Sequence, residues 1–537
     1  MNRRLITAGR EGRQKNQGRK MKRSSEPRRR ATESCAERRR SDAHSLSGHP
    51  WFSTSILRRK IFSCLHFPAL GLCLFVLGSV WPPPALAVGF RAGAATANIT
   101  PPLGIEINGG TTPVIATHVH DELHARALAL DDGATRLAFV VVDNCLIDRA
   151  LVDEAKALIF RHTGINSNHV SISTTHTHSA GSVTGVHLSE PDPPYRAWLP
   201  KRIADAVRIA VNNLAPAQVA WGSGRVPQHV FCRRVTVRPG VTYTNLLGQP
   251  GDRAKMNWSS PEPAVDDDFA SSVDPEVFVL SLQSTDGRPL ALFANYSLHY
   301  VGGVGGGHLS ADYYGVFCER MKELLRAEKQ DPPFVALLSN GTSGDVNNID
   351  FRKARPSQKP YEQIQLVAED VAREVHRVVN TLSHRDDVKL AAVSSELRLA
   401  YRKPSAAETE QARGLIHGRD RLQLRTWPEF YAREQLILAE YPDTASLPLQ
   451  VFRIGELAIA QWPGEVFAVS GLELKRRSPV KPLFNIGLAN GWYGYLPPPQ
   501  QFVLGAYETW RGRTSPMATN AIPQLNESFL KLLEELK

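Results

Sequence analysis

Apolar and polar residues alternate in one stretch of the chain so as to predict a strand that ends in two histidines. In HVSISTTHTHSAGS, residues 169–182, every second residue from Val170 to His178 faces the same side of an extended strand. That face is apolar first and then carries the imidazoles of His176 and His178. Two neutral imidazoles aimed at one point are typical of a metal site, although two partly buried histidines satisfied by neighbours would show the same pattern.

Strands and helices alternate along the rest of the chain. Strand pairs are expected around the Asp-Asp-Gly turn in 123–144 and the Thr-Asp-Gly turn in 276–299. No internal repeat is evident. The alternation predicts an α/β fold with mixed β-sheets flanked by helices. Helices are expected over 149–162 (capped by Asp148), 200–214, 311–327, 362–382 and 523–536, further strands near 217–224 and 333–348, and a long loop over 246–273.

The charge of the chain is concentrated at its N-terminus. The 537 residues carry a formal net charge of +11. Residues 1–60 hold 18 Lys and Arg against 5 Asp and Glu, a surplus of 13 that leaves the remainder at −2. Because the body is almost neutral, we expect no nucleic-acid partner.

The cysteines indicate neither a disulfide framework nor a zinc knuckle. Three of the six, Cys35, Cys64 and Cys73, lie before residue 88. The other three, Cys145, Cys232 and Cys318, are an odd number and widely spaced.

Three segments are expected from the N-terminus onwards. Residues 1–57 form a basic leader without apolar periodicity, which predicts disorder. The segment 58–87 reads as a signal peptide or anchor, with basic residues first, an apolar run over 61–80, and Ala-Leu-Ala at its end. We expect cleavage after Ala87 and export of the hydrolase domain, 88–537, to the cell envelope or outside. If the apolar run is not cleaved, it is long enough to be a membrane anchor.

A third strand-end histidine supports a metal site. The strand LALFANYSLH is expected to deliver His299 at its end, before a Gly-rich loop. Three such histidines could bind zinc, and a hydrolytic zinc also needs a position open for water. Spacing alone does not choose the carboxylate. The candidates are Asp312, Asp345 and Glu465, which read equally well as a helix N-cap, a turn residue and a solvated loop residue.

A second histidine motif is not expected to be catalytic. HDELH, residues 120–124, resembles a zincin helix but has Asp where the general-base Glu belongs. Thr117, His118 and Val119 precede it with the alternation of a strand. We therefore do not expect a metalloprotease site here.

Six segments, in chain order, resemble the neutral ceramidase family. They are THTHS, NYSLH, LSADYYG, NGTSGDVNN, WPGEVF and YGYLPPPQQFVLGAYE. The opening RAGAATANITPPLG also fits the family, and the resemblance runs from about Gly89 to Trp510. It implies a neutral-ceramidase-like catalytic domain that cleaves N-acyl lipids with a catalytic zinc. By motif, the zinc ligands fall on His176, His299, Glu465 and Tyr495.

The resemblance implies roles for three residues beside the metal. Arg233 corresponds to the family's Arg near the substrate carbonyl, and Tyr507 is the second Tyr of the segment that begins at Tyr495. Both would stabilise the oxyanion, a role worth about 3 kcal/mol per donor. His178 would face the substrate and carry a proton to the leaving group. The expected reaction is hydrolysis of a linear amide by a zinc-activated water.

Two features depart from the family. Asn347 stands where the family has a Ser assigned to the amide chemistry, and an amide donates a hydrogen bond but cannot be a nucleophile. After Tyr507 we expect the helix at 523–536 and not the C-terminal β-sandwich of the sphingolipid-cleaving members.

Two other interpretations stay open. An amidohydrolase barrel also begins with His-x-His on a strand, but of its later ligands the chain supplies only His299 convincingly. A cell-surface binding protein that keeps the fold without turnover is favoured by Asn347. Retention of Glu465, Tyr495 and Tyr507 favours the enzyme. The sequence thus predicts an exported zinc hydrolase of lipid amides that associates with a membrane surface.

Overall fold

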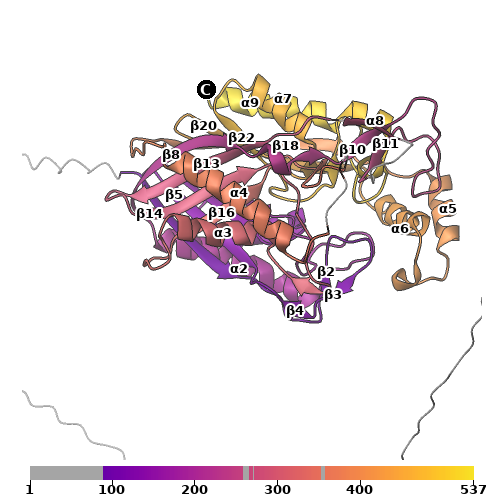
Figure 1. Cartoon of the computed structure of the whole chain (residues 1–537), viewed down its shortest axis with the longest axis horizontal. Helices are drawn as coiled ribbons and strands as arrows, with labels where there is room; N and C mark the ends of the chain where they lie inside the picture. Colours follow the sequence, from indigo (N-terminus) through magenta and orange to yellow (C-terminus); the bar gives the residue numbers. More distant parts are fainter. Residues whose placement is uncertain (1–88, 258–264, 270, 352, 354–356) are drawn as a thin grey trace, which may run out of the picture. The chain divides into compact units, whose positions relative to one another are not determined.

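Two β-sheets pack face to face between layers of helices in the computed structural model of this chain (Figure 1). The structure describes residues 89–257, 265–269, 271–351, 353 and 357–537. The predicted leader at 1–57 and the predicted signal or anchor at 58–87 lie outside these residues. None of the described helices has the length and apolar composition needed to cross a bilayer.

The larger sheet has eight strands and curls so that its edges approach each other. Pairing is parallel at the two edges, β14 with β16 and β6 with β7, and antiparallel in between. The strands at the two ends of this order, β7 and β16, are in contact with each other because of the curl. In pairing order the strands are β16 (Val335–Asn340), β14 (Pro289–Tyr296), β13 (Glu276–Ser284), β8 (Ala215–Arg225), β1 (Arg91–Asn98), β5 (His124–Asp131), β6 (Arg136–Val142) and β7 (Val170–Thr174).

The larger sheet is buried on both faces, which explains its continuous apolar runs. On β6, Ala138 and Val140 pack toward helices α1 (Arg149–Thr163) and α2 (Pro193–Asn212). Phe139 and Val141 point the other way, into the layer between the two sheets. Helices α3 (Asp312–Leu324) and α4 (Glu362–Val379) cover the part of the sheet around β13, β14 and β16 (Figure 1).

The smaller sheet completes the layers. It consists of β18 (Leu390–Ala400), β19 (Thr444–Ile454), β20 (Leu457–Gln461) and β22 (Leu483–Ile486), and its outer face is covered by α9 (Ala521–Glu535), with α7 (Ala468–Arg477) beside it. The layer order is therefore helices, sheet, sheet, helices, as expected for mixed sheets flanked by helices.

The remaining described elements lie outside these two sheets and the helices that cover them. They are β2 (Glu106–Ile107), β3 (Val114–Ile115), β4 (His118–Val119), β9 (Phe231–Cys232), β10 (Arg234–Val237), β11 (Ala254–Met256), β12 (Val265–Phe269), β15 (His308–Leu309), β17 (Val346–Asn347), β21 (Glu465–Val466), β23 (Tyr495–Leu496), α5 (Ala406–Leu415), α6 (Trp427–Ala439), α8 (Pro499–Leu504), η1 (Ser167–His169), η2 (Pro227–His229), η3 (Arg421–Gln423) and η4 (Tyr507–Thr509).

Several predicted boundaries are wrong. Strand β14 ends at Tyr296, three residues before His299, because its partner β16 also ends there, with Tyr296 opposite Asn340. Strand β7 ends at Thr174, before the histidine pair. The segment 246–273 is not one long loop, since β11 and β12 within it both pair with β10. The Asp148 cap of α1 is confirmed, its carboxylate accepting a hydrogen bond from Leu151 N.

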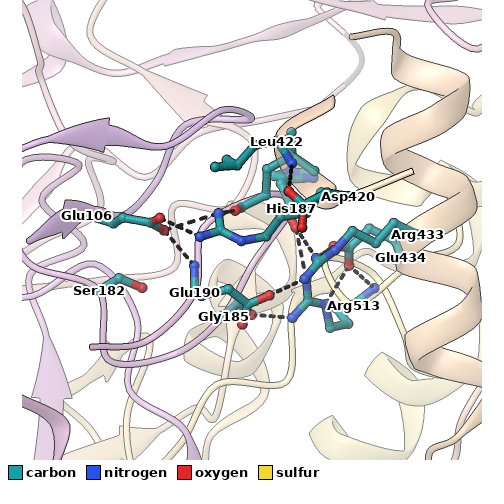
Figure 2. Close-up of polar contacts among 12 residues, drawn as sticks. Glu106, Ser182, Gly185, His187, Glu190, Asp420, Leu422, Arg433, Glu434 and Arg513 are labelled. Atoms are coloured by element: carbon teal, nitrogen blue, oxygen red, sulfur yellow. Dashed lines mark hydrogen bonds and ion pairs between the residues drawn. The ribbon is translucent and has the colours of Figure 1, made fainter. Parts of the chain in front are cut away.

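A group of arginines holds the loop that follows the histidine pair (Figure 2). Arg513 donates hydrogen bonds to the carbonyls of Gly185 and His187, at 2.9 and 3.1 Å. Arg433 on α6 donates to the same His187 carbonyl and to Glu190. Glu434, fully buried beside it, accepts two hydrogen bonds from the Arg513 guanidinium at 2.6 and 2.8 Å. The α6 segment thus fixes the backbone around His187.

Replacing Glu434 with Gln is expected to lower the free energy of unfolding at neutral pH by about 3 kcal/mol, because it leaves the buried Arg513 charge unpaired. Burial alone would raise the pKa of Glu434, but Arg513 holds it below the usual 4.5. The stabilisation is therefore present at neutral pH and is lost as the pH falls below about 4.5. Denaturant unfolding of both proteins across this pH range measures the difference.

Glu410→Gln is the matched control, since Glu410 makes an exposed ion pair with Arg413 on α5. We expect it to change the unfolding free energy by about 0.5 kcal/mol or less. Equal effects of the two substitutions would contradict a stabilising role for the buried pair.

Candidate metal centre and active site

The side chains of His176, His299 and Glu465 meet inside the protein. The two Nε2 atoms lie 3.0 Å apart. Glu465 Oε2 lies 3.3 Å from His176 Nε2 and 3.7 Å from His299 Nε2. Each of the three residues is at most 4% exposed. They follow strands β7, β14 and β20, so the curl of the larger sheet and the stacking of the smaller sheet bring them together.

Backbone carbonyls orient both imidazoles toward the common point. His176 Nδ1 lies 3.0 Å from the carbonyl of Cys145, and His299 Nδ1 lies 3.0 Å from the carbonyl of Ser343. A carbonyl accepts only, so each Nδ1 carries a proton and each Nε2 is left to face the common point. Metal-ligating histidines are held in this way.

The histidine pair converges through a turn and not through strand alternation. His176 has φ of 66°, in the left-handed region, and thus leaves the strand direction. His178 Nε2 comes within 3.2 Å of His176 Nε2, and the His178 ring stacks on Tyr300 with centroids 3.6 Å apart. A Cβ on Gly109 would lie 2.4 Å from the His178 ring, so only glycine fits beside it.

Glu465 is held so that one oxygen faces the histidines. Trp492 Nε1 donates to Oε1 at 2.9 Å. Oε2 is buried without a hydrogen-bond partner. A buried carboxylate oxygen without a hydrogen-bond partner is costly, and a cation held between it and the two imidazoles would satisfy it. The donor set therefore fits a metal ion, zinc being the ion that such His and carboxylate donors commonly bind.

Tyr495 and Tyr507 lie beside this group. Tyr495 on β23 is opposite Glu465 on β21 in a parallel pair, and it contributes a hydrogen bond that lowers the Glu465 pKa. The rings of Tyr495 and Tyr507 are 5.6 Å apart and nearly perpendicular. The Tyr507 hydroxyl lies 3.0 Å from Nε2 of His187. The helix α8 between the two tyrosines turns the chain back toward the site.

Arg233 faces the ring of Tyr495 from 5.3 Å. Its Nε donates to Glu508 at 2.8 Å, and Glu508 also accepts from Arg234. Arg233 Nη2 is buried without a hydrogen-bond partner. Glu508 thus fixes the guanidinium and leaves one donor for another acceptor.

Burial sets the charge states of the groups around the centre. It raises the pKa of Tyr507 well above its usual value, so the hydroxyl is protonated at neutral pH. It lowers the pKa of His178, helped by the charges of His176 and Arg233, and that imidazole is neutral. Burial also raises the pKa of Glu465, but His176 outweighs it and keeps the carboxylate ionised.

The other candidate carboxylates have structural partners. Asp312 accepts hydrogen bonds from the backbone N–H groups of Val301 and Gly302, at 3.0 and 2.8 Å. Asp345 accepts from Ala468 N at 2.9 Å. Only Glu465, of the three candidates that spacing left open, lies with the histidines.

Asn347 is in the neighbouring two-stranded sheet. Its strand β17 pairs with β9, where Asn347 is opposite Phe231. Phe231 is two residues before Arg233 in the chain. The Asn347 amide oxygen accepts from Asn348 Nδ2 at 3.3 Å. Ser343, four residues earlier, is buried, and its hydroxyl donates to Asn340 at 2.7 Å. The Ser343 hydroxyl is therefore engaged elsewhere.

A cavity of about 20 Å³ opens beside these groups, roughly enough for one water. It is lined by His176, His178, Glu465, Tyr495 and Tyr507, together with residues that sequence reasoning missed. His187, Trp492 and Cys145 are among the missed ones, and Glu508 lies behind Arg233. None of these has a motif of its own, since each acts on a ligand or donor from a distant segment.

The comparisons with known proteins identify the family and the fold of this chain. Residues 90–361 match the family model described as neutral/alkaline non-lysosomal ceramidase, N-terminal. A ceramidase solved in complex with C2 is similar at 16% identity, and the neutral ceramidase from Pseudomonas aeruginosa at 17%. Each has a TM-score of 0.62 over 83% of this chain and 75% of the other. The shared fold, mostly antiparallel in its larger sheet, differs from the parallel amidohydrolase barrel.

The family model covers half of the chain, including both histidines of the centre, and the structural match extends over most of the remainder. The chain therefore belongs to the neutral/alkaline non-lysosomal ceramidase family.

Proposed function

We propose that this protein is a zinc-dependent hydrolase of linear amide bonds in N-acyl lipids of the ceramide type. The observation that carries the proposal is the buried convergence of two oriented imidazoles with the unpaired Glu465 Oε2. Membership of the ceramidase family supports an amide as the bond that is cleaved.

His176, His299 and Glu465 would hold the zinc ion, with Tyr495 as the fourth protein group. When bound, the ion supplies a Lewis acid that makes water nucleophilic at neutral pH and polarises the substrate carbonyl. The Cys145 and Ser343 carbonyls and the Trp492 indole orient these ligands, so little reorganisation is needed on loading.

The remaining groups act on the substrate. The neutral imidazole of His178 accepts the proton that water loses when the water oxygen bonds to the carbonyl carbon. It then passes that proton to the leaving nitrogen as the C–N bond breaks, giving a carboxylic acid and an amine. The Tyr507 hydroxyl and the free Nη2 of Arg233 donate to the oxyanion, each worth about 3 kcal/mol. His187 and Glu508 hold these two donors in place.

A second candidate function is a binding protein without turnover, favoured by Asn347 in place of the family Ser. In the hydrolase, Asn347 donates a hydrogen bond to the carbonyl, and water supplies the nucleophile. Export is part of the proposal and rests on the sequence pattern of 58–87 alone, with anchoring by 61–80 as the alternative that would keep the site at a membrane surface.

Replacing His176 with Ala is expected to remove one equivalent of zinc and to lower kcat/KM for a short-chain N-acyl lipid amide by on the order of 10³-fold. The physical reason is that the shared coordination point loses a lone pair oriented by the Cys145 carbonyl. Metal content by mass spectrometry and amine release measure the two effects on the same preparation.

His162→Ala is the matched control, since His162 is an exposed residue in the last turn of α1. It is expected to keep both zinc and activity. Wild-type protein that binds no zinc, or a His176 variant with wild-type metal content, would overturn the ligand assignment.

Tyr507→Phe is expected to keep the zinc and to lower kcat by on the order of 10²-fold, because one oxyanion donor is lost. Tyr493→Phe removes a phenol that bonds the Ser446 carbonyl away from the site, and it serves as the control. An unchanged kcat for Tyr507→Phe would remove this hydroxyl from the mechanism.

Asn347→Ser decides between the hydrolase and the binding protein. If water is the nucleophile, wild type already cleaves amides and the variant changes kcat by less than about tenfold. Asn380→Ser, at the exposed end of α4, controls for a general effect of the substitution. Activity that appears only in Asn347→Ser would show a silenced site and favour the binding protein.

A further inference from the structure

Three histidines outside the candidate active site form a second cluster of imidazoles. His118, His120 and His308 each offer one ring nitrogen, and these atoms all lie within 4.8 Å of one another. The cluster shares no residue with His176, His299 and Glu465. His118 and His120 are exposed and His308 is half-buried, so solvent reaches the cluster.

The backbone places these rings on one side. His118 and His308 are opposite each other in the parallel pair of β4 and β15. His120, two residues beyond His118, has the side-chain direction of a residue on the same face, and its N–H donates to the Leu309 carbonyl at 3.0 Å. The segment 120–124 is not helical, since the chain bends at His120 and Asp121 and β5 begins at His124, and only the first histidine of HDELH belongs to the cluster. His124 instead lies 3.6 Å from Glu122.

Glycines in the loop before His308 allow the close approach. A Cβ on Gly305 would lie 2.5 Å from the His308 ring. Gly307 has φ of 72°, and its carbonyl accepts from Thr117 N at 2.8 Å, next to His118. The Gly-rich sequence of 302–307 thus serves to pack this loop against the histidines.

Tyr361 orients two of the three rings. Its phenolic oxygen lies 2.5 Å from His308 Nδ1 and also accepts from Gly305 N at 3.3 Å. This contact fixes the orientation of the His308 ring. The Tyr361 ring stacks on His120, with centroids 3.6 Å apart and an angle of 10° between planes. This support corresponds to the carbonyls that orient His176 and His299.

We propose that His118, His120 and His308 bind a second divalent transition-metal ion, with Zn²⁺ as the ion used to test it. Three neutral imidazoles suit Zn²⁺ and Cu²⁺ and discriminate against Mg²⁺ and Ca²⁺, which need oxygen ligands. The exposed side leaves a coordination position for water. Because the ligands come from two segments, the ion joins the Gly-rich loop to β4. Tyr361 is a positioning residue for this site.

The test compares zinc stoichiometry after loading and dialysis. Wild type is expected to retain one equivalent more than His308→Gln, and His124→Gln is expected to retain as much as wild type. His124→Gln is the matched control because it removes the second histidine of HDELH, which is not in the cluster. Equal zinc in wild type and His308→Gln would overturn the proposal.

The two metal sites are separated by combining variants. His176→Ala and His308→Gln are each expected to lose one equivalent, and the double variant to lose two. If His176→Ala loses none while His308→Gln loses one, the proposed catalytic centre fails and this second site stands. If only His176→Ala loses one equivalent of zinc, the catalytic centre stands and this second site fails.

Copper and Tyr361 give measurements that do not depend on the folding of His308→Gln. Cu²⁺ added to His176→Ala protein is expected to give an electron paramagnetic resonance spectrum with splittings from imidazole nitrogens. Tyr361→Phe, which keeps all three histidines, is expected to weaken zinc binding at this site by about 10–100-fold. A spectrum without nitrogen splittings, or unchanged affinity in Tyr361→Phe, would count against the site as described.

Discussion

The structure depends on burying two imidazoles and a carboxylate at one point where both sheets end. Charged and polar groups are costly to bury unless they are paired, and His176, His299 and Glu465 are almost completely buried. The surrounding fold reduces this cost through fixed partners: two backbone carbonyls for the imidazoles and the Trp492 indole for one carboxylate oxygen. Those partners come from different segments, so the site exists only when the curled sheet and the smaller sheet are assembled.

A second set of buried charged residues fixes the groups on the side of the site where the proposed substrate would bind. Glu508 lies between Arg233 and Arg234, and Glu434 holds Arg513. Arg513 and Arg433 in turn fix the carbonyl of His187 (Figure 2). The His187 ring contacts the Tyr507 hydroxyl. The helix α6 therefore influences the oxyanion donors without touching the metal centre, because it fixes the backbone that carries His187.

The sequence allowed the fold class and the histidines of the centre to be predicted from local patterns, whereas Glu465 was chosen from three carboxylates only through the family resemblance. The apolar runs of β6 and β14 and the cap of α1 follow from periodicity and from Asp148. The convergence of His176 with His178 was predicted for the wrong reason, since a left-handed His176 and not strand alternation produces it. Trp492 and His187 could not be predicted, because each acts across the fold on a residue from another segment. The zinc ligands themselves, including Tyr495, stay a prediction.

Unpaired polar atoms inside the site favour a ligand-binding centre over a decayed one. Glu465 Oε2, Arg233 Nη2 and His187 Nδ1 are all buried without a hydrogen-bond partner. Each such atom costs about 1–3 kcal/mol of stability, and a chain released from function would be more stable with apolar residues there. Glu465 faces His176 and His299, and Arg233 lies over Tyr495, so these atoms are placed to meet the two charges of the proposed reaction: a cation at the centre and an oxyanion beside it. Asn347 meets neither of these two charges, so under the proposed mechanism the replacement of the family Ser leaves the arrangement of Glu465 and Arg233 unchanged.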